Sequence, residues 1–317
     1  MRISDFGGEF RLIEALTRRP ERDEVQVGVG DDAAVLAMGD DDLLVWTVDM
    51  LSEGDHFRTD WSSGRQVGLK AMNSNLSDIA AMGAKPVAAL VSLSLTGDTE
   101  VEWVREVYEG FNKLCRKHSF DIVGGDTTHS SVHLISISVL GEVSRRNLCL
   151  RSHAVAGDLI CVTGELGKST AGLELLKAGE SGETKWFLEG NCRLIEAQII
   201  APHANAMIDV SDGLASEVNH VCRQSGVGAR INAEDVPLAE NAVKTAKKLG
   251  HNPLDYALSG GEDFELVFTT SPENLEKIRL DCPLTVVGEI TDKKGETVLV
   301  DKKDAERELT GGFNHFG

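Results

Sequence analysis

The sequence predicts a mixed α/β protein built from two domains. Segments with apolar residues at helical spacing alternate with short apolar runs typical of strands, and 317 residues suffice for two ordinary domains. The pattern also indicates a domain boundary near residue 150, where the basic stretch 145–151 is followed by a glycine turn and a new strand. We therefore expect an N-terminal domain over 1–150 and a C-terminal domain over 151–317.

In the N-terminal half, three helical segments are interleaved with strands. We expect helices at 8–18, 65–83 and 100–118, and strands at 43–49, 87–95, 120–123 and 132–143. The run 87–95 is apolar enough to predict a strand buried on both faces. In the second helix, Asp78 lies about half a turn away from the apolar stripe that begins at Leu69, so it faces away from that stripe.

In the C-terminal half, the same alternation continues with shorter elements. We expect strands at 159–163, 206–210, 266–270 and 284–291, helices at 189–200 and 213–225, and a hairpin near 294–295. The stretch 164–169 looks like a phosphate-binding P-loop, but the Walker pattern needs a glycine where Val162 stands. We expect an ordinary strand-to-helix turn there, with Ser169 or Thr170 as the helix N-cap.

Aspartates recur beside apolar or glycine-rich segments. The first turn, 28–35, carries Asp31 and Asp32 after two glycines, and the later examples are Asp49, Asp78, Asp126, Asp209 and Asp212. A desolvated, unpaired carboxylate is costly, so these groups are either solvated or face cations. Oxygen ligands without paired histidines or cysteines favour magnesium. In extended chain Thr47 projects to the same side as Asp49, and Ser211 to the same side as Asp209.

Composition narrows the class of protein. Asp and Glu total 51 against 32 Lys and Arg, a formal net charge of −19, which argues against a nucleic-acid partner but not against an anionic small substrate. The six cysteines are scattered without Cys-x-x-Cys spacing, which predicts neither a zinc site nor a disulfide framework. No apolar stretch is long enough to span a membrane. These features predict a cytoplasmic protein without a membrane partner.

Taken together, the motifs resemble the thiamine-monophosphate kinase family, part of a superfamily of ATP-using enzymes that includes aminoimidazole ribonucleotide synthetase. Any one motif is weak, but their order over nearly the whole chain is specific. The matching pieces are Gly30-Asp31-Asp32, Asp49 with His56, Asn75-Leu76-Ser77-Asp78, Gly124-Gly125-Asp126, Arg151, Thr163-Gly164-Glu165-Leu166-Gly167, Asp209-Val210-Ser211-Asp212-Gly213, Gly260-Gly261-Glu262-Asp263 and the terminal Gly-Phe-x-His-Phe.

The resemblance implies transfer of the γ-phosphoryl group of ATP to thiamine monophosphate, the last step of thiamine diphosphate biosynthesis, with several Mg²⁺ ions. It also implies a homodimer in which the N-terminal sheet pairs with its twin. The implied metal ligands are Asp31, Thr47, Asp49, Asp78, Asp126, Asp209 and Asp212, of which Asp126, Asp209 and Asp212 are the catalytic set. The implied ATP contacts are Gly125, Asp126, Arg151 and Ser211, and the implied acceptor contacts are His56, Glu262 and Phe313.

One departure from the family pattern is Val48: the family often has Ser/Thr-Thr-Asp at this strand end, where this chain has Thr47-Val48-Asp49. A side-chain contact to metal would be lost there, whereas a main-chain contact would survive. Two alternatives remain: another enzyme of the superfamily, or a divalent-cation-binding protein without enzymatic activity. A selenophosphate synthetase would carry a reactive cysteine near its start, but the first here is Cys115. None of the acidic turns has the EF-hand spacing.

Overall fold

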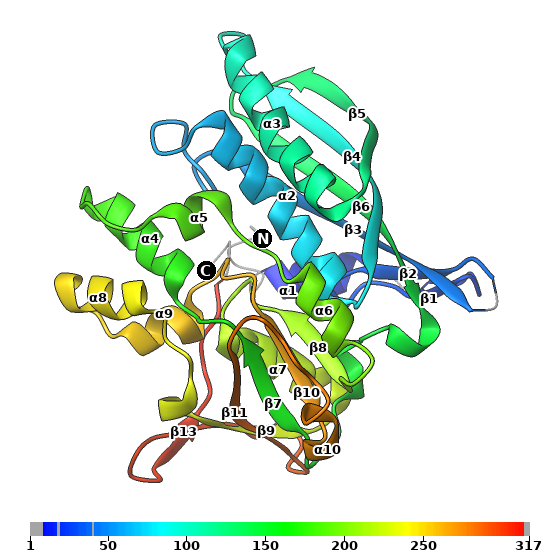
Figure 1. The fold of residues 1–317 in the computed structure, drawn as a ribbon, viewed down its shortest axis with the longest axis vertical. Helices are drawn as coiled ribbons and strands as arrows, with labels where there is room; N and C mark the ends of the chain where they lie inside the picture. The colour runs from blue at the N-terminus through cyan, green and yellow to red at the C-terminus, as the bar shows by residue number, and fades with distance from the viewer. Residues whose placement is uncertain (1–8, 18–19, 40, 314–317) are drawn as a thin grey trace.

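The computed structural model describes residues 9–17, 20–39 and 41–313. It is a mixed α/β structure with two sheets, as the sequence predicts (Figure 1). The helices are α1 (Glu9–Leu16), α2 (Gly64–Ala81), α3 (Val101–His118), α4 (Lys168–Ala178), α5 (Lys185–Glu189), α6 (Leu194–Ile200), α7 (Leu214–Ser225), α8 (Glu240–Leu249), α9 (Pro253–Ser259) and α10 (Pro272–Leu275).

The first sheet has six strands in the order β1-β2-β3-β6-β4-β5, and only the pairing of β4 with β5 is parallel. The two helices α2 and α3 pack together, and α2 lies against β3 and β6. The strands are β1 (Val25–Val27), β2 (Ala34–Ala37), β3 (Asp42–Ser52), β4 (Lys85–Leu95), β5 (Asp121–His129) and β6 (Leu134–Ser144).

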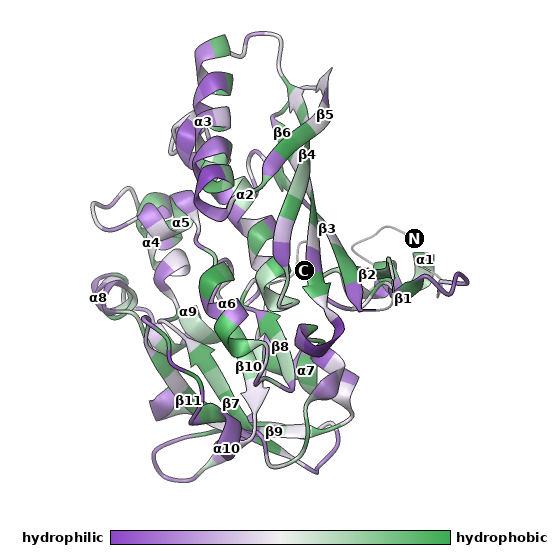
Figure 2. Cartoon of the chain, turned by 45° about the vertical axis from the view of Figure 1, so that its right-hand side comes forward, coloured by the Kyte–Doolittle hydropathy of each residue, from purple (hydrophilic) through white to green (hydrophobic). Residues whose placement is uncertain are grey.

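The second sheet has seven strands in the order β13-β12-β9-β11-β7-β10-β8. In Figure 2 its strands β7 and β8 are hydrophobic, while α3 of the first half carries hydrophilic bands. The strands are β7 (Leu159–Thr163), β8 (Ala206–Asp209), β9 (Gly228–Asn232), β10 (Leu266–Thr270), β11 (Leu284–Thr291), β12 (Thr297–Val300) and β13 (Glu306–Glu308). The expected hairpin near 294–295 is wrong, because β9 lies between β11 and β12 and pairs with β12 in parallel.

Strand β4 is not buried on both faces, contrary to expectation. Its burial alternates, with Ala89 and Val91 in the core and Val87 and Leu90 on an exposed face. Apolar side chains of β3 share that exposed face, so the sheet is covered by helices on one side only within the described part of the chain. We refer to the uncovered side as the open face.

The expected strand at 120–123 is longer in the structure, because β5 continues through Gly124 and Gly125 to His129. An irregularity in the β4–β5 register beside Leu90 accommodates the extra residue Val123. A Cβ on Gly125 would lie 1.7 Å from the carbonyl oxygen of Val91, so only glycine allows the two strands to approach this closely.

Helix α2 is buried almost all round because it is packed between the first sheet and the second half of the chain. The apolar side chains of α2 face the core beneath the first sheet. Polar side chains spaced at i, i+3 and i+7 along the helix form a stripe that contacts the C-terminal half of the chain. Within that stripe Lys70 reaches Glu262, Asn73 donates to the Glu189 carbonyl (3.1 Å), and Ser77 donates to Asp209 (2.6 Å). The helix begins with a capping box formed by Ser63 and Gln66. Among the described residues no helix is long and apolar enough to cross a membrane.

Candidate functional site

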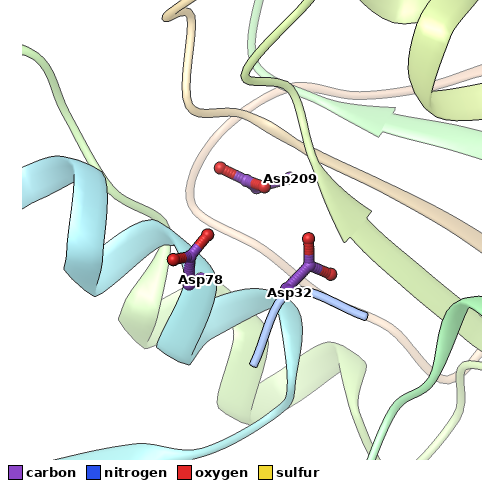
Figure 3. Close-up of side chains that lie close together, drawn as sticks. All are labelled: Asp32, Asp78 and Asp209. Carbon is purple, nitrogen blue, oxygen red and sulfur yellow. The ribbon is translucent and has the colours of Figure 1, made fainter. Parts of the chain in front are cut away.

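Three aspartates from three separate elements converge where the two halves of the chain meet (Figure 3). Asp32 comes from the turn before β2, Asp78 from the last turn of α2, and Asp209 from the end of β8. One carboxylate oxygen of each lies within 4.8 Å of the others. Asp32 and Asp209 are buried and Asp78 is half-buried. We call these three residues the aspartate trio.

The trio is electrostatically unfavourable without a cation. Burial raises the pKa of Asp209 to about 8, and the charge of Asp32 acts in the same direction. Burial, followed by repulsion from Asp49 and Asp209, raises the pKa of Asp78 well above its ordinary value. The Oδ2 atom of Asp32 is buried and has no hydrogen-bond partner among the described residues. Such an all-oxygen, acidic set fits a hard divalent cation such as Mg²⁺.

Two more predicted residues lie beside the trio. On β3, Thr47 and Asp49 lie on the side of the sheet that faces α2. The Thr47 hydroxyl donates to Asp78 Oδ2 (2.5 Å), and the Asp49 main-chain N–H donates to Asn75 Oδ1 (3.1 Å). Burial raises the pKa of Asp49, and the nearby charges of Glu262 and Asp32 add to this. The predicted pairing of Thr47 and Asp49 on one side of an extended strand therefore agrees with the structure.

The first acidic turn places Asp32, not Asp31, in the trio. Asp31 Oδ2 instead accepts from the main-chain N–H of Arg151 (3.2 Å), while the Arg151 guanidinium pairs with Asp32. Arg151 therefore sits at the edge of the trio with both acids as partners. The family resemblance implies Asp31 as a metal ligand, and two adjacent acids in a glycine turn carry no periodic signal that distinguishes them.

The acidic turn at 209–213 is held by a buried glutamate, Glu217, which was not predicted. Glu217 on α7 accepts a hydrogen bond from the Asp212 main-chain N–H through Oε1 (2.8 Å). The N-cap of α7 is Gly213, so Asp212 does not serve in that role. A Glu five residues after an Asp was the available signal, because it places an acceptor in the first turn of the helix behind the loop.

The expected N-cap of α4 is wrong as well. Gly167 is the N-cap, and the buried Asp263 carboxylate accepts from the main-chain N–H groups of Gly167 and Ser169 (3.0 Å to the latter). The residue that caps this helix lies far away in sequence, so no local pattern could reveal it.

A cavity of about 400 Å³ adjoins the trio and contains the predicted acceptor residues. His56, Glu262 and Phe313 all line it, together with Asp49, Ser211 and Asp212. The Ser52 main-chain N–H donates to His56 Nδ1 (3.1 Å), which leaves the proton of the neutral ring on Nε2. His315 and Phe316 of the terminal motif lie outside the described residues.

Asp126 and Gly125 are not brought to the trio within one chain. The register places Asp126 beside Ser92 on the open face, whereas the trio lies on the α2 side of the same sheet. Asp126 Oδ1 accepts from the main-chain N–H of Thr127 (2.9 Å) and the residue is exposed.

Comparison with known proteins extends over the whole chain. Residues 30–143 match the family described as AIR synthase related protein, N-terminal domain, and residues 155–301 match the corresponding C-terminal domain. The chain is 35% identical to the thiamine-monophosphate kinase of Bacillus subtilis, covering 97% of this chain and 99% of the relative. It is 37% identical to that of Aquifex aeolicus, covering 100% of both.

Solved structures agree with these relatives. The structure described as "AaThiL complexed with AMPPCP and TMP" has a TM-score of 0.88 and 33% identity, covering 99% of each chain. Hydrogenase maturation protein HypE shares the fold with a TM-score of 0.74 at 18% identity, covering 91% of this chain and 95% of that one.

Proposed function

Because the chain belongs to the thiamine-monophosphate kinase family of AIR synthase related proteins, we propose that it transfers the γ-phosphoryl group of ATP to thiamine monophosphate, giving thiamine diphosphate and ADP. This would be the last step of thiamine diphosphate biosynthesis. The observation that carries the proposal is the aspartate trio, assembled from both halves of the chain beside a cavity that holds His56, Glu262 and Phe313.

The proposed reaction needs charge neutralisation more than proton transfer. The second pKa of a phosphomonoester is about 6, so the acceptor phosphate is already mostly anionic at pH 7. The obstacle is repulsion between about four negative charges on ATP and about two on the acceptor, and positioning and electrostatic stabilisation dominate such transfers. Arg151 supplies a fixed positive charge at the edge of the trio. His56 and Glu262 both line the cavity, and Glu262 offers a carboxylate to a cationic acceptor.

The residues present fit Mg²⁺, and the proposed ligand set differs from the expected one at two positions: Asp32 takes the place of Asp31, and Asp126 would come from a partner copy. Asp32, Asp78 and Asp209 would hold the ion or ions, with Asp49, Thr47 and Asp212 beside them. Bound Mg²⁺ supplies positive charge that screens the phosphates and aligns the attacking and leaving oxygens. Asp31 is reassigned from metal ligand to partner of Arg151. Ser211 and Arg151 remain the proposed ATP contacts on this chain.

We propose that two copies pair through the open face. Trp46, Val48 and Val123 are 51%, 63% and 65% exposed there, and a hollow of about 320 Å³ on the same face is lined almost wholly by apolar side chains. Contiguous apolar surface of this kind marks interaction sites in soluble proteins. In such a homodimer Asp126 and Gly125 would lie at the interface and complete the ATP and metal site of the partner.

The same proposal assigns a role to each half of the chain. Residues 1–150 would form the ATP- and Mg²⁺-binding, dimerising domain, and 151–317 would complete the active site from the other side. The two sheets occupy 25–144 and 159–308, which supports a boundary between them. All six cysteines are free thiols, and five of them are buried, which supports a reducing cytoplasmic setting.

The direct test is ADP release from ATP by the purified chain with thiamine monophosphate, with and without Mg²⁺. We expect turnover that needs both, and thiamine diphosphate as the product. The substrate of aminoimidazole ribonucleotide synthetase serves as the comparison, because turnover with it alone would indicate an enzyme of that class instead. Calcium or magnesium binding without any turnover would indicate a non-enzymatic cation-binding protein.

A further inference from the structure

A buried lysine of α2 links two of the residues that line the acceptor cavity. Lys70 is 1% exposed, and its Nζ donates to the main-chain carbonyl of His56 (2.7 Å) and to Glu262 Oε2 (2.8 Å). The ammonium group also lies 3.7 Å from the centroid of the Phe187 ring. One side chain thus contacts the His56 loop of the first half and the Glu262 turn of the second.

Packing alone does not explain a charge at this position. Burial of an ammonium group is expensive, and the burial lowers the pKa of Lys70 against the opposing pull of Glu262. An apolar side chain of similar length would fill the same space beside Phe187 without this cost. What Lys70 provides and an apolar residue cannot is a pair of directed hydrogen bonds.

Glu262, which accepts the hydrogen bond from Lys70, has an uncommon backbone conformation. Its φ is +64°, in the left-handed region that non-glycine residues seldom adopt, and its main-chain N–H donates to the Ser211 carbonyl (2.9 Å). Phe264, two residues later, also has a positive φ of 50°. Strain of this kind persists where surrounding contacts over-determine it, and it concentrates at ligand sites. The main chain of Glu262 is therefore fixed by the Ser211 turn and its carboxylate by Lys70.

We propose that Lys70 is a positioning residue for the acceptor substrate. It holds one carboxylate oxygen of Glu262 and the backbone of His56, so that both groups face the cavity at a fixed separation. The group of the acceptor that this arrangement suits is a positive charge, which would pair with the Glu262 carboxylate whose direction Lys70 sets. This inference rests on the proposed function and adds a residue that acts through Glu262, not on the phosphates.

The chain contains a matched control for the test. Lys168 is also a buried lysine, paired with the buried Glu265 and lying over the ring of Trp186 at 4.6 Å. It resembles Lys70 in burial, partner type and aromatic neighbour, but it does not line the acceptor cavity. K168M therefore reports what the loss of a buried ion pair does to folding alone.

The experiment measures KM for thiamine monophosphate, KM for ATP and kcat in K70M, K168M, E262Q and the double variant K70M/E262Q, with thermal unfolding of each. A hydrogen bond to a charged group is worth about 1.5–3 kcal/mol, so we expect K70M to raise the acceptor KM about 10- to 100-fold. The KM for ATP in K70M should stay within about twofold of the wild-type value, because Lys70 does not act on the ATP site. A change in the acceptor KM without a change in the ATP KM distinguishes positioning of the acceptor from general disruption of the site. The K168M variant should lower the unfolding temperature and leave the acceptor KM within about twofold.

If Lys70 acts through Glu262, the double variant should be no worse than the more impaired single variant. Additive effects, an unchanged acceptor KM in K70M, or a parallel rise in the KM for ATP would each overturn the inference. Should K70M not fold, K70Q takes its place: the glutamine side chain is one atom shorter than that of lysine, so it does not reach both the His56 carbonyl and Glu262 Oε2. An acceptor KM equal to that of the wild type in K70Q would then count against the proposal. A wild-type chain without thiamine monophosphate kinase activity refutes the proposed function itself, whereas an active wild type with an unaffected K70M refutes only the role of Lys70.

Discussion

Replacing Asp209 by asparagine should make the metal-free protein more stable and abolish its response to magnesium. Burial raises the pKa of Asp209 from 3.8 to about 8 in the folded chain. A carboxyl group whose pKa is raised on folding stabilises the fold fully only below its unfolded pKa, and this contribution is lost as the pH rises through the folded pKa. For Asp209 the loss therefore runs from about pH 4 to about pH 8.

The size of the effect follows from the same shift. One pKa unit corresponds to about 1.4 kcal/mol, so at pH 8 the burial of Asp209 opposes folding by up to about 5 kcal/mol. Relaxation and water penetration reduce such penalties in real proteins, and we expect D209N to gain about 2 kcal/mol at pH 8 and almost nothing near pH 4. The amide oxygen can still accept the hydrogen bond from Ser77 that Asp209 Oδ2 accepts at 2.6 Å.

Urea unfolding in EDTA, repeated across this pH range and then with Mg²⁺, measures both effects. Mg²⁺ should stabilise the wild type, most strongly near pH 8, and should not stabilise D209N. The control is D158N, because the buried Asp158 carboxylate accepts from Asn205 (2.9 Å), Thr269 (3.1 Å) and the Val155 N–H (3.0 Å), and an amide nitrogen there would face donors. D158N should therefore destabilise. The reasoning fails if D209N is no more stable than wild type in EDTA at pH 8, or if Mg²⁺ stabilises both equally.

Three further predictions concern the dimer and the cavity. D126N should abolish turnover with an unchanged unfolding temperature, and mixing D126N with D209N chains should restore about a quarter of wild-type activity if each site uses Asp126 of the partner; no recovery after subunit exchange would place Asp126 elsewhere. H56A and F313A should raise the KM for thiamine monophosphate but not for ATP, and an unchanged acceptor KM in both would remove them from the cavity's function. W46E should shift the chain to monomers in sedimentation measurements, whereas an equally dimeric W46E would exclude the open face as the interface.

Much of the secondary structure was predictable because the hydrophobic periodicity of a long helix or strand can be read from its own residues. The segments 65–83 and 100–118 are helices within two residues of the expected bounds, since their apolar stripes are long and regular. The two-sided burial of 87–95 was wrong because an apolar run shows that a strand is hydrophobic but not which neighbour covers it. The hairpin at 294–295 was wrong because a turn signal does not reveal that a third strand, β9, enters between the two arms.

The site was predictable in type but not in every residue. Recurrent aspartates beside apolar or glycine-rich segments predicted a cation site of oxygen ligands, and Asp78 and Asp209 do meet, although 131 positions separate them. Asp31 was implied by the family resemblance, and local sequence does not encode which of two adjacent acids in a glycine turn points toward the other aspartates. Lys70 was invisible for a different reason: a single lysine in a helix normally reaches solvent, and its burial depends on how the second half packs on α2.

The placement of the trio on three elements couples cation binding to the relative position of the two halves. Asp32 and Asp78 belong to the first half and Asp209 to the second, so the distances between their oxygens depend on how the two halves pack against each other. A cation bound by all three would stabilise the contact between the halves. By thermodynamic reciprocity, any change that strengthens this contact would raise the affinity for the cation by the same factor.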